Sequence, residues 1–181
     1  MDSENPTGAD NQQETALLRA SLDPMWIVGF VDGEGCFSVS VHRNAFMHRH
    51  GGWQIQPVFH VYQHRDHRDV LDELTFFFGC GSVRSKGARS DVMTFSVSSL
   101  NHLRILIVPV FEEHQLRVKA GDFRSFAAIV RAMSRRDHLT RSGFEEIVRL
   151  AFGMNANGKQ RSHTLGEILA GSSETARQAC E

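Results

Sequence analysis

The stretch WIVGFVDGEGCFSVSV, residues 26–41, decides the fold, because its hydrophobic pattern changes in the middle. Its first part is apolar up to Val31, and its second part alternates polar and apolar residues from Cys36 to Val41. Two acids, Asp32 and Glu34, stand among glycines at the junction. A carboxylate at the end of an apolar segment is costly unless something neutralises it. The junction is therefore the first place to look for chemistry.

The flanks of this stretch predict a helix followed by a strand. Asp23 is a good N-cap and Pro24 suits the first helical position, so a helix should run from there to the glycines at 33 and 35. The alternation after Cys36 is typical of a half-buried strand. A polar loop over 44–52 should lead to a second strand over about 53–63, with Ile55 on its apolar face.

The remaining pattern completes an αββαββα order with further helix behind it. We expect a helix over about 65–78 ended by Gly79, a hairpin turning at GARS (87–90), and helices over about 100–112, 120–134 and 140–154. The fold class is α+β, with a four-stranded antiparallel sheet covered on one face by helices. Phenylalanines at helical spacing should form the core: Phe76, Phe77, Phe78, Phe123, Phe126 and Phe144.

The net charge of −1 conceals an uneven distribution. Seven of the 21 acids and one of the 20 bases lie in the first 34 residues, which leaves 14 acids against 19 bases for the rest. A basic body is typical of nucleic-acid binding. We expect a disordered acidic leader over 1–20, one domain over 21–161 and a flexible tail over 162–181.

Several classes of protein are disfavoured. The chain has no long apolar run and no apolar signal sequence at its start, so we expect an intracellular protein that does not enter membranes, in a bacterial cytoplasm or an organelle. Its three cysteines form no CxxC pair, and its ten histidines lack partners at zinc-ligand spacing. Partial protonation of surface histidines near pH 6.5 should add to the basic character.

At the junction the sequence resembles a known family. GFVDGEG resembles the motif of the LAGLIDADG homing endonucleases, and FHVYQHRDHRDVLDEL, FGCGSVRSKG, LRVKAGDFRSF and HLTRSGFEEIVRLAFGMNANGKQR resemble later blocks of single-motif members. The resemblance covers roughly residues 23–161. It implies an αββαββα fold with a saddle-shaped sheet on DNA.

The resemblance also implies a homodimer, since only one copy of the motif is visible. Gly29 and Gly33 share one helix face, which lets a second such helix approach closely. The implied interface residues are Trp26, Gly29, Phe30 and Gly33. A tandem monomer with a diverged second motif is a further reading, but too few strand-like segments follow residue 100.

The implied active site centres on Glu34. With the Gly33 carbonyl it would hold Mg²⁺, or another divalent cation such as Mn²⁺ or Ca²⁺. Asp32 is expected to have a structural role at the helix end. Lys119 matches the basic active-site residue of the family, with Arg117 as a possible substitute, and Gln63 matches the position that orders water near the metal.

If the polar sheet face lies in the major groove, strand alternation selects the side chains that reach bases. The predicted DNA contacts are Ser38, Ser40, His42, Asn44, Gln54, Gln56, His60, Tyr62, Ser82, Arg84, Lys86, Arg89, Asp91 and Thr94.

The resemblance therefore implies a metal-dependent, site-specific DNA endonuclease that cuts a long, near-palindromic target as a homodimer and is encoded in an intron that is a mobile element. The alternative is an RNA maturase that assists splicing of its own intron, or a DNA-binding relict that no longer cleaves. The intact Glu34 disfavours the relict.

Overall fold

The computed structural model of the protein describes residues 22–154 and 162–178. The acidic leader expected over 1–20 lies outside these residues. Within the described ranges, no helix combines the length and the apolar character needed to cross a bilayer.

The predicted helix-to-strand junction is confirmed. Helix α2 covers Pro24–Glu34, and the Asp23 carboxylate caps it by accepting the Met25 N–H at 2.8 Å. Strand β1, Gly35–Arg43, follows without an intervening loop. A Cβ at Gly35 would lie 2.6 Å from Val31 Cγ1, so only glycine fits where the chain leaves the helix.

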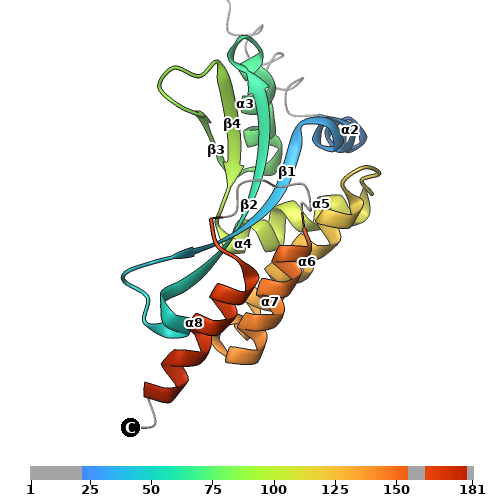
Figure 1. Cartoon of the computed structure of the whole chain (residues 1–181). Coiled ribbons are helices and arrows are strands. Elements are labelled where there is room, and N and C mark those ends of the chain that lie inside the picture. The colour runs from blue at the N-terminus through green and yellow to red at the C-terminus, as the bar shows by residue number, and fades with distance from the viewer. Residues whose placement is uncertain (1–21, 155–161, 179–181) are drawn as a thin grey trace, which may run out of the picture.

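Four antiparallel strands form one sheet in the order β1-β2-β4-β3, with strands β2 (Trp53–His64), β3 (Ser82–Ser85) and β4 (Val92–Val97). The register pairs Phe37 with Phe59 and Phe59 with Val97, which places these side chains on one face. Figure 1 shows α2 at one end of β1 and the loop over 44–52 at the other end.

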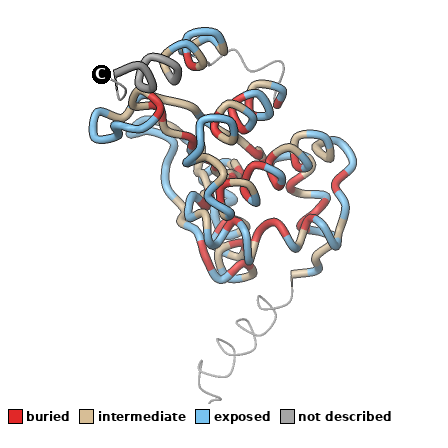
Figure 2. The backbone as a smooth tube through the Cα atoms, turned by 90° about the horizontal axis from the view of Figure 1, so that it is seen from below, coloured by how far each residue is buried: buried red, intermediate tan, exposed pale blue. Residues whose placement is uncertain are grey.

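Helices cover that apolar face. They are α3 (Arg68–Phe78), α4 (Leu100–His102), α5 (Val108–Glu113), α6 (Ala120–Ser134) and α7 (Arg141–Gly153), with short turns η2 (Arg65–His67), η3 (Leu103–Ile107) and η4 (Asp137–Leu139). Phe37 lies at the centre of the core, with its ring 5.1 Å from Phe59, 5.5 Å from Phe111 and 5.3 Å from Phe126. In Figure 2, buried positions recur between exposed ones along the helical coils, as expected for helices with one face on a core.

The helix expected over 100–112 is present but is wider than an α-helix in its middle. The π-helical turn η3 ends at Ile107, two residues before Pro109, which has no N–H to donate. A proline ring also clashes with the preceding turn of a regular helix, and a π turn relieves both problems.

Two expectations were wrong. The flexible tail expected over 162–181 contains helix α8, Leu165–Gln178, which packs on the short helix η1 (Arg49–Gly52) and buries Ile168. Phe76 was expected in the core but is 62% exposed, whereas Phe78, Phe123, Phe126 and Phe144 are buried. Phe76 has the right helical spacing, but the covered face of α3 is narrower than the run of three phenylalanines.

Candidate active site and nucleic-acid interface

The Asp32 carboxylate joins the end of α2 to the start of α6. Its oxygens accept the backbone N–H groups of Arg117 at 2.7 Å, Val118 at 3.1 Å and Lys119 at 3.0 Å. These three donors directly precede α6, so the carboxylate holds the segment that leads into that helix, 85 residues or more away in the chain. The structural role expected for Asp32 is confirmed.

Lys119 turns its side chain back onto the same junction. Its ammonium donates hydrogen bonds to the carbonyl oxygens of Asp32 and of Gly33, the latter at 2.9 Å. The structure therefore brings Lys119 beside the predicted metal ligands. Arg117 was the possible substitute for Lys119. Its backbone N–H binds the Asp32 carboxylate, and its side chain is exposed.

Glu34 is the last residue of α2 and is exposed to solvent, as is Gly33. The main-chain carbonyls of Asp32 and Gly33 beside it both accept hydrogen bonds from a positively charged group, the Lys119 ammonium. The possible metal ligands at this place, two carbonyls and the Glu34 carboxylate, are all oxygen atoms, which fit a hard divalent cation. In the described part of the chain no three His, Cys, Asp or Glu residues gather around one point. The oxygen atoms that the chain itself offers here are the Asp32 and Gly33 carbonyls and the Glu34 carboxylate.

Partial burial by itself would raise the pKa of Asp32, but the three backbone N–H donors and the Lys119 ammonium together lower it. A lowered carboxyl pKa stabilises the fold above the unfolded value of about 4, and this contribution is lost as the pH falls through the folded value. We expect Asp32→Asn to lower the free energy of unfolding at neutral pH by about 1.5–3 kcal/mol, the range for hydrogen bonds to a charged group. Thermal unfolding between neutral pH and about pH 3 should show a flatter acid dependence for the variant than for the wild type.

Gln63 lies near the end of β2, two residues beyond Val61, the partner of Gly35. It is therefore at the same end of the sheet as Glu34. Its side-chain oxygen accepts the His64 N–H at 2.8 Å, and its partner across the sheet is Met93. The predicted contact with water near a metal remains a prediction.

The outer face of α2 has no partner within the described subunit. Trp26 is 45% exposed and stacks on Phe30 with ring centroids 5.0 Å apart. No atom lies within 4 Å of a Cβ built on Gly29 or Gly33. These four residues follow helical spacing and form one apolar, glycine-notched strip, whereas Ile27, Val28 and Val31 face the core.

The predicted nucleic-acid contacts that lie in the strands share the face of the sheet opposite the core, whereas Asn44, Lys86, Arg89 and Asp91 lie in the loops at the strand ends. Register sets His60 beside Cys36 and Ser96, Tyr62 beside Thr94, and Gln56 beside Ser40. None of the four strands contains an acid. This polar face is neutral to basic throughout, which suits a polyanion.

Several of these side chains already have partners in the free subunit. The Ser38 and Ser40 hydroxyls donate to carbonyls of β2 at 3.2 and 3.5 Å. Asn44 donates to the Gln54 side chain at 2.6 Å, and Lys86 lies over the Tyr62 ring at 5.0 Å. These contacts fix the positions of the side chains before any ligand arrives.

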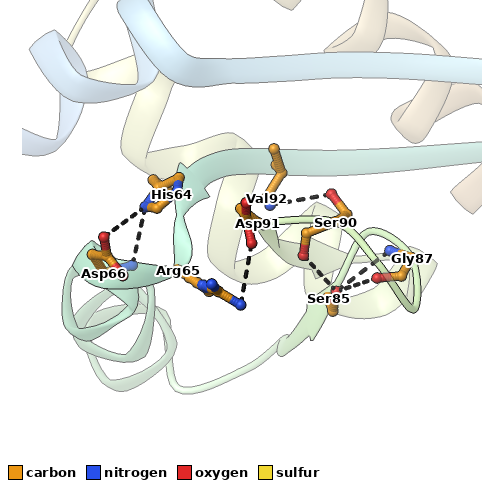
Figure 3. A network of polar contacts seen from close by, with 8 residues as sticks. All are labelled: His64, Arg65, Asp66, Ser85, Gly87, Ser90, Asp91 and Val92. Carbon is orange, nitrogen blue, oxygen red and sulfur yellow. Dashed lines mark hydrogen bonds and ion pairs between the residues drawn. The ribbon is translucent and has the colours of Figure 1, made fainter.

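Asp91 and the turn after β3 are held by the network in Figure 3. The Asp91 carboxylate lies 3.1 Å from the Arg65 guanidinium, and the Asp91 carbonyl accepts the Arg65 N–H at 2.7 Å. Ser85 donates to the Gly87 carbonyl at 2.7 Å, and Ser90 accepts the Val92 N–H at 3.1 Å. Arg65 was not singled out in the sequence, where nothing local links it to a residue 26 positions away.

The expectation that histidines add charge fails for three of them. Burial lowers the pKa of His50, His60 and His138, so these imidazoles stay neutral at pH 7. His50 stacks on Phe144 with ring centroids 4.2 Å apart, and its Nε2 lies 2.9 Å from the His138 carbonyl. A carbonyl only accepts, so Nε2 carries the proton. The pair fixes the 44–52 loop to the turn between α6 and α7.

A histidine whose pKa is lowered on folding stabilises the fold above the unfolded value of about 6.5, and this contribution falls as the pH drops below it. We therefore expect the thermal midpoint to be lower at about pH 5.5 than at about pH 7.5. His50→Phe keeps a ring on Phe144 but cannot titrate. Calorimetry should show a smaller pH difference for the variant, and an unchanged difference would contradict this role of His50.

Comparison with known proteins decides the family. The sequence model described as LAGLIDADG endonuclease matches residues 27–130, which include the α2 junction, the sheet and most of α6. The chain belongs to the LAGLIDADG endonuclease family. The resemblance of GFVDGEG and the order of the elements are both confirmed by this match.

The fold is similar to solved structures of LAGLIDADG proteins. The crystal structure of the homing endonuclease I-TnaI is 36% identical, with a TM-score of 0.71, over 86% of this chain and 99% of that one. I-SmaMI bound to cleaved DNA is 30% identical, with a TM-score of 0.71, over 86% of this chain and 49% of that one, and it has also been crystallised with uncleaved target and calcium ions.

Among curated LAGLIDADG relatives, the Probable intron-encoded endonuclease 2 of Neurospora crassa is 33% identical over 143 residues, which are 78% of this chain and 31% of the relative. The chain spans about 30% of the length of this relative and of two other fungal ones.

Proposed function

We propose that the protein is a site-specific, metal-dependent endonuclease for double-stranded DNA that acts as a homodimer. The observation that carries this proposal is the position of Lys119. Its ammonium contacts the carbonyl of Gly33, next to the exposed carboxylate of Glu34, at the end of a sheet whose strands contain no acid. The Glu34 carboxylate, the Lys119 ammonium and the end of a sheet without acids thus occupy one edge of the molecule.

The homodimer rests on the outer strip of α2. Trp26, Gly29, Phe30 and Gly33 are apolar or lack a side chain, and they have open space before them. A second copy of the strip, related by a two-fold axis, would bury the two aromatic rings and allow close helix contact at the glycines. It would also bring a second Glu34 to the same place, which supplies the carboxylate that one subunit lacks.

Glu34 and the Gly33 carbonyl would hold the divalent cation, for which we propose Mg²⁺. A bound divalent cation supplies charge neutralisation for the phosphate and lowers the pKa of a bound water. Lys119 stabilises the negative charge that develops on the phosphate oxygens as the water oxygen bonds to phosphorus and the ester oxygen leaves. Gln63 orients the attacking water. Asp32 acts as a positioning residue, because it fixes the backbone of Lys119.

The polar face of the sheet would lie in the major groove. Arg84 and Lys86 can meet guanine or phosphate, and Gln54 and Gln56 can pair with adenine. A β1 strand of nine residues is roughly 30 Å long, close to one turn of DNA. A dimer with two such strands running outward therefore reads a long site with two similar halves.

Cleavage can be tested with a supercoiled plasmid that carries the uninterrupted allele of the host gene, spliced across the insertion point. The purified protein should linearise this plasmid with Mg²⁺ and leave it intact in EDTA. It should not cut the allele that contains the insertion. Binding without cleavage under every divalent cation would favour the relict, and accelerated splicing of the intron RNA would favour the maturase.

An intron-borne origin is proposed by analogy with the Neurospora relative, whose name describes it as intron-encoded. Such an origin places the target inside the cell, in the genome that carries the uninterrupted allele.

A further inference from the structure

The loop over 44–52, between β1 and β2, is built as a rigid platform. Asn44 closes it by donating its N–H to the Gly52 carbonyl at 2.8 Å and by accepting the Phe46 N–H on its side chain at 3.0 Å. Arg43 donates to the Gly51 carbonyl, and Arg49 donates to the Leu139 carbonyl at 2.9 Å. Together with the His50 contacts, these bonds tie both sides of the loop to the fold.

The tip of this platform exposes an aromatic ring. Phe46 is 91% exposed, and its neighbour Met47 is 38% exposed. A phenylalanine loses the benefit of burial when it faces water, and a rigid loop gives it no way to fold back onto the core. An apolar side chain presented in this way is typical of a contact surface for a partner.

The charge around Phe46 identifies the partner as a polyanion. No Asp or Glu occurs between Gly35 and Arg65, and two arginines of this segment, Arg43 and Arg49, lie at the base of the loop and within it. Asn44 links the loop to Gln54 on the polar sheet face, so the loop continues the surface proposed to bind DNA. Phenylalanine is one of the apolar side chains that DNA-binding proteins insert between base steps.

The position of the loop predicts where on the DNA this contact occurs. Figure 1 shows the loop at the end of β1 opposite α2, the helix proposed to lie at the dimer centre. A strand of nine residues places the loop roughly 30 Å from that centre, or about 9 base pairs along the duplex.

We infer that Phe46 packs into a base step at the outer end of each half of the target and unstacks it. The contact makes Phe46 a determinant of specificity through DNA deformability rather than through hydrogen bonds to base edges. This inference rests on the proposed DNA-binding function.

The test pairs a side-chain deletion with a shortened duplex. A target is first selected by the wild-type protein from a random-sequence pool. It is then made as a duplex of about 26 base pairs, and as one of about 14 that ends inside the reach of the loop. Phe46→Ala should weaken binding to the long duplex by about 5- to 100-fold and leave binding to the short one unchanged. Phe46→Leu, which keeps an apolar wedge, should recover part of the loss.

Two further measurements identify the contact. The dependence of binding on salt should keep its slope in Phe46→Ala, because no phosphate contact is lost. 2-Aminopurine placed about 9 base pairs from the centre should brighten with the wild type and not with Phe46→Ala. Phe76→Ala, which removes another exposed ring, on α3, is the matched control and should change binding to neither duplex.

If Phe46→Ala loses the same amount of binding affinity on both duplexes, or none on the long one, the inference is overturned while the proposed function stands. A changed oligomeric state of Phe46→Ala without DNA, seen by sedimentation, overturns it in favour of a contact between copies of the chain. A wild type that selects no duplex from the pool ends the proposed function, and the inference with it.

Discussion

Glu34→Gln is expected to bind target DNA as the wild type does and to leave supercoiled plasmid uncut. The amide keeps the size of the side chain but removes the charge that a divalent cation requires. Loss of one electrostatic contact to a transition state costs on the order of 10²–10³ in rate, and a dimer loses two carboxylates at once. The rate of plasmid linearisation should therefore fall by at least about 10³-fold.

Glu113→Gln is the matched control for this experiment. Glu113 is an exposed acid at the end of α5 and is none of the predicted site residues, so its variant should cut at the wild-type rate. Binding is measured by gel shift in Ca²⁺ and cleavage in Mg²⁺. Wild-type cleavage by Glu34→Gln would remove the carboxylate from the mechanism.

Gly29→Leu is expected to convert the dimer to a monomer without unfolding the subunit. A Cβ on Gly29 meets no atom within 4 Å, so the folded subunit has room for the new side chain. Replacing a helical glycine should even stabilise the free subunit by about 0.5–1 kcal/mol. In the proposed dimer the same side chain would separate two helices in close contact, and overpacking costs about 1–3 kcal/mol at each of two sites.

The dimer dissociation constant should rise by about 10²-fold or more, since each 1.4 kcal/mol corresponds to a factor of ten. Sedimentation at several concentrations measures the association, and thermal unfolding measures the subunit. Gly153→Leu is the control, because Gly153 is also an exposed helical glycine with open space around it. A Gly29→Leu variant that stays dimeric and cuts DNA, or a wild-type monomer on its target, would contradict the proposed interface.

Local features of the sequence predicted most of the fold. Asp23 and Pro24 began a helix, Gly79 ended one in the left-handed conformation, and alternation from Cys36 marked a strand, because each effect acts within a few residues. Helix α8 could not be predicted in the same way. It is set by distant contacts such as Gly171 against Trp53, where a Cβ would lie 2.9 Å from the indole nitrogen.

The same distinction holds at the candidate site. The resemblance of the motif predicted Glu34 and Gly33 directly, since both lie within one short stretch. Spacing alone left Lys119 and Arg117 as alternatives. The choice follows from the bonds of Asp32 to three successive N–H groups, which aim the third side chain, rather than the first, at Gly33. Pairings across 85 residues leave no periodic signal in the sequence.

The hydrogen bonds of Asp32 to the residues before α6 also determine when, during synthesis, the proposed active site becomes complete. A ribosome completes Glu34 long before it completes Lys119, and the two meet only after the start of α6 has docked onto the end of α2. A nascent or prematurely terminated chain that stops before residue 117 therefore carries the acidic motif without its ammonium partner. The proposed cleavage of DNA is in this way limited to chains whose synthesis has passed well beyond the sheet.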